Sequence, residues 1–232
     1  MARTADVVEA IKGMILTGEL CAGDRLPTEK DLAIRLGVSR GPLREGVSAL
    51  AAMGVLDTRQ GDGTYVTSLQ FDLLMAPLTF IVDLHGPAGA RDFLAVRRTL
   101  ECEAASSAAL KIDAAGLLDA ESALADAAHA LAEAPHDYER FFTADVAFHR
   151  IVADAAGNPV LAGLIESISG KTARARLLRG AVEDGAQQRT IDEHRAILRA
   201  ISGRDPDRAR VQMAAHLIGV EDFVQIAPQE EL

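Results

Sequence analysis

The sequence predicts a mainly α-helical protein. A small N-terminal domain of three helices and a β-hairpin is expected to precede an all-α bundle of six or seven helices. Three observations support this fold class: β-prone segments occur only before about residue 70, apolar residues recur at helical spacing along the rest of the chain, and Gly and Pro clusters interrupt those helical patterns. With 232 residues, 49% of them hydrophobic, the chain is long enough for one small and one medium-sized domain.

The first domain is expected to span residues 1–68. Apolar residues at helical spacing predict a first helix over residues 6–17. Thr28 has the residue type and position of an N-cap, which predicts a second short helix after it. Ser39 is expected to cap a third helix that runs to about Met53.

Two short β-prone segments, residues 55–59 and 64–68, flank a glycine-rich turn around Gly61, which predicts a hairpin. Three helices followed by a hairpin is the order of elements in a winged helix-turn-helix. In such a domain the N-terminal residues of the recognition helix reach base edges in the major groove. Arg40 and Arg44 lie one turn apart at the start of the third helix, so the pattern predicts binding to double-stranded DNA.

The distribution of charge is compatible with this prediction. The net charge of −10 would by itself argue against nucleic-acid binding, because DNA attracts cations. Residues 1–68 have a net charge of only −1, however, and residues 69–232 account for −9. Cationic side chains also recur every four or five positions within residues 25–44. Local distribution, not net charge, decides whether a surface can meet phosphate.

The second domain is expected to span residues 69–232. Ala-rich amphipathic patterns predict a helical bundle there, and Asp205-Pro206 has the form of a helix start. No window approaches 18 uninterrupted apolar residues, and no signal-like segment begins the chain, so we expect a cytoplasmic protein with no membrane partner. Cys21 and Cys102 lack a CxxC partner and fit small buried residues in a reducing compartment.

Three of the six histidines lie on the apolar faces of predicted helices: His149, His194 and His216. Asp145 precedes His149 by four residues and therefore shares its helix face. Any one buried histidine is more simply explained by a hydrogen bond, but four such groups from three helices favour a divalent metal ion. Imidazole and carboxylate ligands suit Zn²⁺ best, with Mn²⁺, Ni²⁺ or Fe²⁺ as alternatives. The other histidines, His85, His129 and His136, are assigned to surface or capping positions.

Residues 18–66, GELCAGDRLPTEKDLAIRLGVSRGPLREGVSALAAMGVLDTRQGDGTYV, resemble the DNA-binding domain of the GntR family. The family pattern runs approximately G-x-L-x-P-G-x-x-L-P-S-E-R-x-L-A-x-x-L-G-V-S-R-x-x-V-R-E-A-L, with G-x-G-T-x-V in the hairpin. This resemblance implies DNA contacts by six residues: Lys30, Ser39, Arg40, Gly41, Arg44 and Gly61. Lys30, Gly41 and Gly46 depart from the usual Arg, Thr and Ala, so the operator sequence cannot be copied from relatives.

Residues 70–226 resemble the FCD domain, the effector domain of the FadR subfamily. The resemblance rests on an ordered set of fragments: Arg97-Arg-Thr-Leu-Glu101, Asp145-Val-Ala-Phe-His149, Gly157-Asn-Pro159, His194 and His216. It implies a metal held by Asp145, His149, His194 and His216, with open positions for a ligand carboxylate. An extra helix over residues 70–84 resembles the seven-helix form of this domain.

The same resemblance suggests three ligand-binding residues: Arg97, Glu101 and Asn158. Arg97 is expected to be semi-buried and to need an anion, which is either Glu101 four residues later or the carboxylate of the ligand. Arg98 is a competing candidate for the same role. Asn158 is also explained as the N-cap before Pro159, so its ligand role is one of two interpretations.

These features predict a homodimeric transcription repressor that is released from its operator by a small carboxylate effector bound at the metal. Two alternatives remain at this point. In the first, the His and Asp groups form a metal-dependent enzyme, although Glu101 is the only nearby candidate for a general base and Arg97 would keep it ionised. In the second, the metal is structural and the protein binds DNA constitutively.

Overall fold

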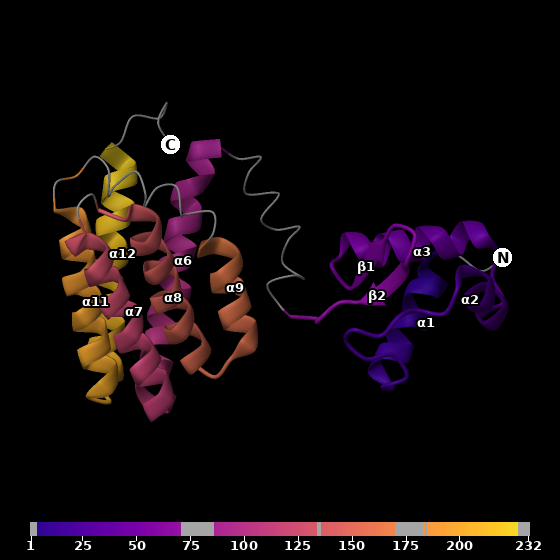
Figure 1. Ribbon diagram of the computed structural model, residues 1–232, viewed down its shortest axis with the longest axis horizontal. Helices are drawn as coiled ribbons and strands as arrows, with labels where there is room; N and C mark the ends of the chain where they lie inside the picture. The colour runs from indigo at the N-terminus through magenta and orange to yellow at the C-terminus, as the bar shows by residue number, and fades with distance from the viewer. Residues whose placement is uncertain (1–3, 71–85, 134–135, 170–182, 184, 227–232) are drawn as a thin grey trace. The chain divides into compact units, whose positions relative to one another are not determined.

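A computed structural model describes residues 4–70, 86–133, 136–169, 183 and 185–226 of the chain (Figure 1). The chain divides into two compact units, Met1–Pro77 and Leu78–Leu232. Apart from residue 70, which is not helical, the helix predicted for residues 70–84 lies outside the described residues, as does His85. The predicted fold class, mainly α with one small hairpin, is confirmed.

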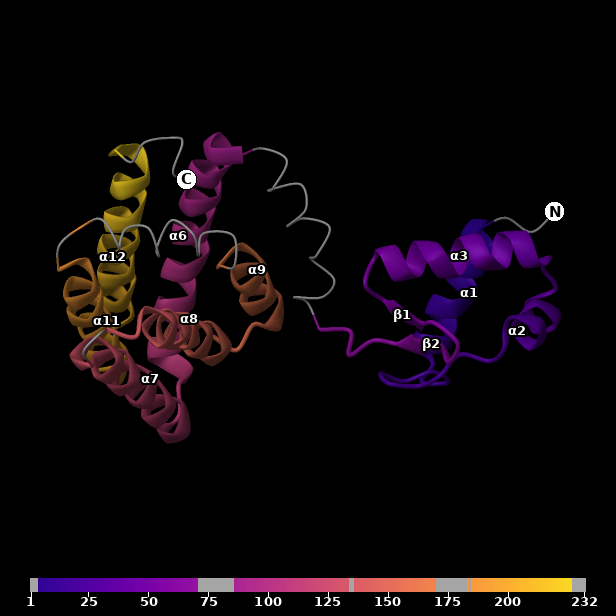
Figure 2. The same cartoon turned by 45° about the horizontal axis from the view of Figure 1, so that its top comes forward.

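The N-terminal unit contains three helices and a two-stranded antiparallel hairpin. Their bounds are α1 (Thr4–Leu16), α2 (Glu29–Leu36), α3 (Arg40–Ala52), β1 (Leu56–Arg59) and β2 (Gly63–Val66). Leu56 pairs with Val66 and Arg59 pairs with Gly63 across the hairpin. The helix α2 leads into one end of α3, and the hairpin follows the other end (Figures 1 and 2).

Local sequence signals set the limits of α2 as predicted. The hydroxyl of Thr28 accepts a hydrogen bond from the backbone N–H of Asp31, so one of the unpaired donors at the helix start is satisfied. Gly37 ends the helix in a left-handed conformation, with φ of 65°, which glycine adopts at little cost. The unit is held together by one apolar core, which includes Val7, Ile11, Leu20, Leu32, Leu43, Leu50, Leu56 and Val66.

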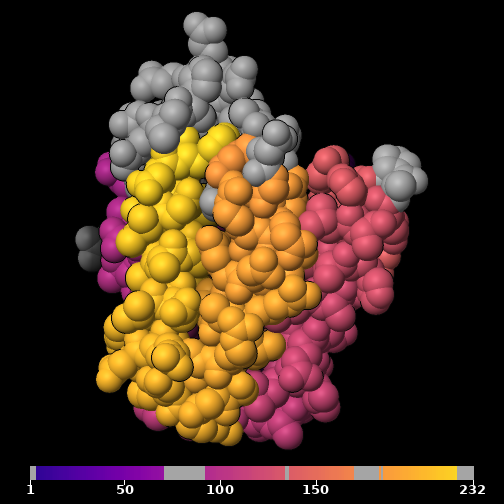
Figure 3. Space-filling view, turned by 90° about the vertical axis from the view of Figure 1, so that its left-hand side faces the viewer, coloured from indigo at the N-terminus to yellow at the C-terminus, as the bar shows by residue number. Residues whose placement is uncertain are grey.

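The C-terminal unit is all-helical in its described part, with six helices and no strand. Their bounds are α6 (Gly86–Lys111), α7 (Ala114–Ala132), α8 (Tyr138–Ala155), α9 (Pro159–Ser169), α11 (Ala186–Ser202) and α12 (Pro206–Ile226). The long helix α6 packs against α12, α7 packs against α8, and α11 packs against α12. The helices α12 and α11 lie side by side along one face of the bundle (Figure 3).

Small residues allow the helices of this bundle to approach closely. Ala105, Ala108, Ala109 and Ala120 are completely buried in its main apolar core. The predicted helix start at Asp205-Pro206 is confirmed, because the Asp205 carboxylate accepts a 2.9 Å hydrogen bond from the backbone N–H of Arg208. Close helix packing of this kind leaves little room for buried polar side chains, so those that occur need specific partners.

Two cysteines were expected to be buried, and this is correct for one of them. Cys102 is buried in the bundle, whereas Cys21 is exposed in the connection between α1 and α2. The backbone N–H of Cys21 donates to the side chain of Asp24, so the turn that contains it is fixed by polar contacts and not by burial. None of the described helices is both long and apolar enough to cross a membrane.

Candidate functional sites

The recognition helix of the N-terminal unit begins with exposed residues. Arg40 is the first residue of α3, and Ser39 precedes it in an extended conformation. The hydroxyl of Ser39 makes no capping hydrogen bond, contrary to expectation. All six residues predicted to contact DNA are exposed: Lys30, Ser39, Arg40, Gly41, Arg44 and Gly61. Four of them belong to the start of α3, while Lys30 lies on α2 and Gly61 lies in the turn of the hairpin.

Two residues in the middle of α3 connect this helix to α1. Glu45 accepts a 2.6 Å hydrogen bond from the hydroxyl of Thr4, the first residue of α1. Gly46 faces Val7 so closely that an added Cβ would lie 2.7 Å from the Val7 Cγ1 atom. Glycine has a low helix propensity, but at this position it allows α1 and α3 to pack closely. This packing holds the recognition helix α3 against α1.

The hairpin is stiffened by contacts to its aromatic residue. The Tyr65 ring lies 4.3 Å from the guanidinium carbon of Arg59 and 6.0 Å from that of Arg25, within the range of cation–π attraction. Its hydroxyl donates a 2.9 Å hydrogen bond to Asp62. Arg25 also donates to the backbone carbonyl of Asp62. These contacts hold the glycine turn at Gly61, where φ is 78°, in one conformation.

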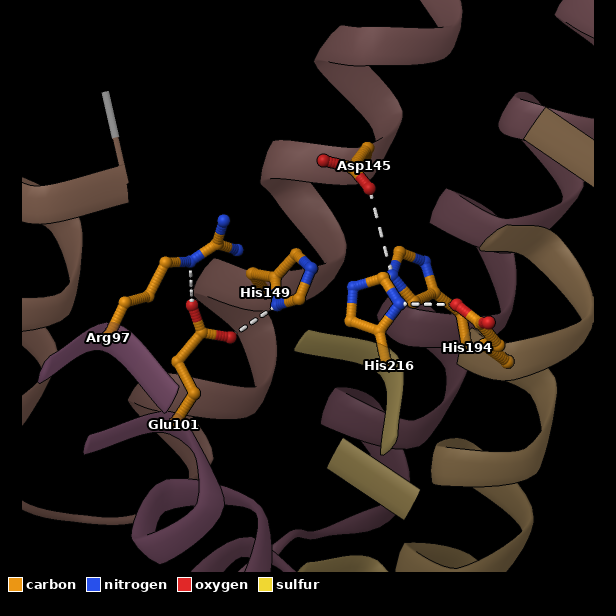
Figure 4. A network of polar contacts seen from close by, with 7 residues as sticks. Arg97, Glu101, Asp145, His149, His194 and His216 are labelled. Atoms are coloured by element: carbon orange, nitrogen blue, oxygen red, sulfur yellow. Dashed lines mark hydrogen bonds and ion pairs between the residues drawn. The ribbon is translucent and has the colours of Figure 1, made fainter. Parts of the chain in front are cut away.

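In the bundle, three buried histidines from three helices meet. His149 on α8, His194 on α11 and His216 on α12 are 1–2% exposed, and one ring nitrogen of each lies within 4.8 Å of the others. The Nε2 atoms of His194 and His216 are 3.2 Å apart. Figure 4 shows the three rings pointing toward one another. The sequence predicted this convergence from the apolar faces of the three helices.

Carboxylates determine where two of these histidines keep their protons. The Nδ1 atom of His149 donates to Glu101, and the Nδ1 atom of His216 donates to Glu193 at 2.8 Å. A neutral imidazole that donates from Nδ1 has a lone pair on Nε2. Burial, assisted by the neighbouring His149, lowers the pKa of His216 well below its usual value, so His216 is neutral near pH 7.

The resulting arrangement fits a metal ion. The Nε2 atom of His149 is buried and has no hydrogen-bond partner among the described residues. An unpaired buried nitrogen costs free energy, and a cation bound to its lone pair would remove that cost. Carboxylates on the opposite nitrogen are the usual outer partners of metal-binding histidines, because they fix the tautomer and increase the basicity of the ligand.

Asp145 lies beside the three histidines. It is 5% exposed, and its Oδ1 atom is 3.7 Å from the Nε2 atom of His194. Because Asp145 precedes His149 by one helical turn, both side chains come from the same face of α8. Of the four predicted metal ligands, the three histidines therefore form the tight group and the aspartate lies at its edge (Figure 4).

The predicted ligand residue Arg97 is fully buried, not semi-buried as expected. Its Nε atom donates to one oxygen of Glu101, and the other oxygen of Glu101 accepts from His149. Burial alone would raise the pKa of the Glu101 carboxyl, but the charge of Arg97 and the contact with His149 hold it well below its usual range. Glu101 thus remains a carboxylate that connects Arg97 to the histidine group (Figure 4).

Other candidates lie away from this group. Asn158 is exposed and accepts hydrogen bonds from the N–H groups of Val160 and Leu161 at 3.1 and 3.2 Å, which is the N-cap role. Arg98, the competing candidate for anion binding, forms an ion pair with Glu221 on α12. The histidines assigned to surface positions, His129 and His136, are exposed.

Sequence reasoning missed Glu193, the carboxylate that accepts from His216. Glu193 directly precedes His194 on α11, so the two side chains point in different directions around the helix. Its contact is with a histidine 23 residues later on α12. A signal was available in principle, because a carboxylate near a predicted metal-binding histidine is a common outer partner, but only the packing of α11 against α12 brings the two together.

Two family models match the chain in the order of its two units. Residues 3–66 match the model described as "Bacterial regulatory proteins, gntR family". Residues 92–219 match the model described as "FCD domain". The first match includes the three helices and the hairpin of the N-terminal unit, and the second includes all four predicted metal ligands.

Similar proteins agree with these matches. The chain is 35% identical to "HTH-type transcriptional regulator LutR" of Bacillus subtilis, over 91% of this chain and 96% of that protein. It is 28% identical to "HTH-type transcriptional repressor NanR" of Klebsiella aerogenes, over 92% and 82%. A solved structure of "Streptococcus agalactiae GntR" matches with a TM-score of 0.67 and 27% identity, over 94% of this chain and 99% of that one.

These relatives are named as regulators, and neither matched domain is an enzyme domain, which argues against the metal-dependent enzyme considered above. The exposed start of α3, the hairpin and the helical bundle are the parts that the two family models describe. The chain therefore belongs to the GntR family of bacterial regulatory proteins and is a DNA-binding transcription regulator with a C-terminal FCD domain.

Proposed function

We propose that this regulator is a cytoplasmic repressor that leaves its operator when a small organic acid binds at a divalent metal ion in the bundle. The observation that carries the proposal is the convergence of three buried imidazoles, two of which keep their protons on Nδ1 by donating to carboxylates. In this arrangement the buried Nε2 atom of His149 has no hydrogen-bond partner among the described residues, which costs free energy unless a ligand binds there. A ligand at this place would act on the packing of α8, α11 and α12.

The metal would be held by Asp145, His149, His194 and His216. Three nitrogen ligands and one carboxylate favour Zn²⁺, and Mn²⁺, Ni²⁺ or Fe²⁺ have similar ligand preferences. When bound, the ion would supply a positive charge and coordination positions that a carboxylate of the effector can fill.

Arg97 would provide a second cationic contact for the effector. Its burial supports this role, because a guanidinium in a dry interior binds an anion much more strongly than one in water. Glu101 holds the Nε atom of Arg97 and thereby orients the other edge of the guanidinium. We assign Glu101 to orientation of Arg97 and His149, and Asn158 to capping of α9, in place of the direct ligand contacts first considered.

On DNA, we propose that a homodimer places two copies of α3 in successive major grooves, with half-sites about one helical turn apart. Lys30, Ser39, Arg40, Arg44 and Gly61 would contact the duplex, and Gly41 would allow close approach of the backbone. We place the boundary of this DNA-binding domain near residue 68, after the hairpin.

The direction of control, repression, is supported by the name of the NanR relative. A small acid that binds one arrangement of the dimer better than the other would shift it away from DNA.

The test is a thermal-shift screen of the metal-loaded protein against a panel of small carboxylic acids, followed by operator binding in the presence of any acid that responds. We expect one acid to raise Tm by several degrees and to weaken operator binding. Both effects should be lost in Asp145→Ala. The exposed variant Asp154→Ala, on the same helix, is the matched control and should respond like the wild type.

Two other results would be informative. If metal is bound and no acid changes Tm or operator affinity, the carboxylate-on-metal proposal is wrong, and a structural metal in a constitutive DNA binder becomes the better explanation. If the purified protein takes up no divalent ion from a Zn²⁺ titration, the metal assignment itself is wrong.

A further inference from the structure

The two helices of the helix-turn-helix are joined by an ion pair on the exposed surface. Glu29 is the first residue of α2, and Arg44 lies one turn into α3. The Nε atom of Arg44 donates to both carboxylate oxygens of Glu29, at 2.9 and 3.2 Å. Both side chains remain largely exposed, with 67% of Arg44 and 52% of Glu29 accessible to solvent.

This contact uses only one of the nitrogen atoms of the Arg44 guanidinium. The two Nη atoms make no hydrogen bond to any other described residue. These atoms form the end of the fork that reaches guanine O6 and N7, or two phosphate oxygens, in a bidentate contact. Glu29 therefore holds the inner edge of the guanidinium and leaves its outer edge available.

We infer that Glu29 is a positioning residue that orients Arg44 for DNA binding and acts through Arg44 alone. The inference rests on the proposed DNA contact of Arg44. An arginine side chain loses considerable rotamer freedom when it is fixed in a complex. Because the ion pair fixes part of the side chain before DNA arrives, it lowers the entropy lost on binding.

The neighbouring arginines provide a comparison. Arg40 begins the same helix and forms no ion pair or hydrogen bond through its side chain with another described residue. Arg35 on α2 pairs with Glu19 and is also exposed, at 51% against 67% for Arg44, but it is not among the residues assigned to DNA. The Glu19–Arg35 pair is therefore a matched control for loss of an exposed ion pair in the same domain.

Two other effects of Glu29 must be separated from positioning. An acidic residue in the first turn stabilises a helix through the helix dipole, so its loss could weaken α2. A negative charge close to DNA also repels phosphate, so its loss could strengthen binding to any duplex. Positioning through Arg44 predicts a different result from both, because only positioning disappears when Arg44 is absent.

The experiment is a double-mutant cycle with the full-length protein, read by fluorescence anisotropy. The probes are a duplex selected from a random pool for tight binding to the wild-type protein and a scrambled duplex of the same composition. The variants are Glu29→Ala, Glu29→Gln, Arg44→Ala, the double variant Glu29→Ala/Arg44→Ala, and the control Glu19→Ala. Thermal unfolding of each variant shows whether α2 remains folded.

We expect Glu29→Ala to weaken binding of the selected duplex about fivefold to tenfold, in the range of measured couplings between contacting residues. In the Arg44→Ala background the same change should have less than about a twofold effect. Glu29→Gln, which keeps an oxygen acceptor, should restore part of the affinity. Glu29→Ala should change the affinity for the scrambled duplex less than the affinity for the selected duplex, and Glu19→Ala should bind the selected duplex like the wild type.

Three results would overturn the inference in distinguishable ways. If Arg44→Ala binds the selected duplex like the wild type, the DNA assignment of Arg44 is wrong and the positioning role falls with it. If Arg44→Ala binds weakly but Glu29→Ala binds normally or more tightly, only the positioning role is wrong. If Glu29→Ala has the same effect with and without Arg44, Glu29 acts through the stability of α2.

Discussion

The two units of this regulator use charged residues in opposite ways. In the N-terminal unit the candidate functional residues are exposed, most of them at the start of α3, and the ion pair that one of them forms, Glu29–Arg44, is solvated. In the bundle the candidate residues are buried and come from four helices. For example, Glu101 connects Arg97 on its own helix to His149 on another. An exposed site can therefore change residue by residue with little effect on folding, whereas the buried site is part of the core.

The energetic consequence follows from solvation. Exposed ion pairs contribute about 0–1 kcal/mol, because water screens them and their side chains lose entropy. A buried charge that loses its partner costs about 3–5 kcal/mol. Substitutions of the exposed charged residues in the first unit should therefore change DNA affinity without unfolding the domain, whereas substitutions of the buried charged residues in the second should change stability first.

The largest effect is expected for Glu101→Ala. The substitution removes the buried carboxylate that accepts from both Arg97 and His149, and we expect the bundle to lose about 3–5 kcal/mol of unfolding free energy. Urea unfolding of the metal-free protein measures this loss. Arg195→Ala, which removes an exposed ion pair with Asp192 in the same bundle, should cost less than about 1 kcal/mol. Equal losses in the two variants would show that removing a buried charge costs no more than removing an exposed one.

The next effect concerns metal affinity. Glu193→Gln keeps a hydrogen-bond acceptor for His216 but removes the charge that increases the basicity of the imidazole, so we expect about a 10–100-fold loss of Zn²⁺ affinity. Competition with a chelator of known affinity measures it. The adjacent exposed variant Asp192→Asn is the control. Unchanged affinity in Glu193→Gln would mean that His216 is not a metal ligand or does not depend on this partner.

A smaller effect is expected where the recognition helix packs on α1. In Gly46→Ala the new methyl group meets Val7, and overpacking of about 1–3 kcal/mol exceeds the gain of about 1 kcal/mol in helix propensity. Thermal unfolding should show a net loss. Gly41→Ala, where nothing lies within 4 Å of an added Cβ, should be neutral or stabilising. A stabilising Gly46→Ala would show that α1 moves away easily.

An effect of similar size is a pH dependence of the metal-free bundle. The pKa of His216 is lower in the folded than in the unfolded state, so the unfolded chain takes up the proton first as pH falls. Stability is then lost below the unfolded pKa of about 6.5, by about 1.4 kcal/mol for each pH unit. Urea unfolding at pH 7.5 and 5.5 measures this loss, which His216→Gln should reduce. An equal pH dependence in that variant would assign the effect to other groups.

Most of the N-terminal unit could be predicted because its signals are local. The cap at Thr28, the left-handed Gly37 and the hairpin turn each depend on a few adjacent residues. The hydroxyl of Ser39 was the exception, because residue type alone does not determine whether a hydroxyl turns toward the helix end. The reason for a glycine at position 46 could not be predicted either, because it depends on close contact with Val7 on another helix.

In the bundle, sequence reasoning identified the faces but not the contacts between helices. The periodicity of apolar residues correctly predicted that His149, His194 and His216 point inward. It underestimated the burial of Arg97, because charged residues are rarely placed fully inside proteins. It also missed Glu193, whose role depends on how α11 and α12 pack together. Which side chains from different helices meet depends on how the helices pack, and a single sequence does not specify this packing directly.

The spacing of the three histidines along the chain has a consequence for unfolding. His194 and His216 are 22 residues apart, and His149 lies a further 45 residues before His194. An ion joined to all three would close two long loops, as a pair of disulfides does, and would remove chain entropy from the unfolded state. Unlike a disulfide, such a cross-link would also form under reducing conditions and would dissolve when the ion is withdrawn. The supply of metal in the cell would then set how long the bundle resists unfolding and proteolysis.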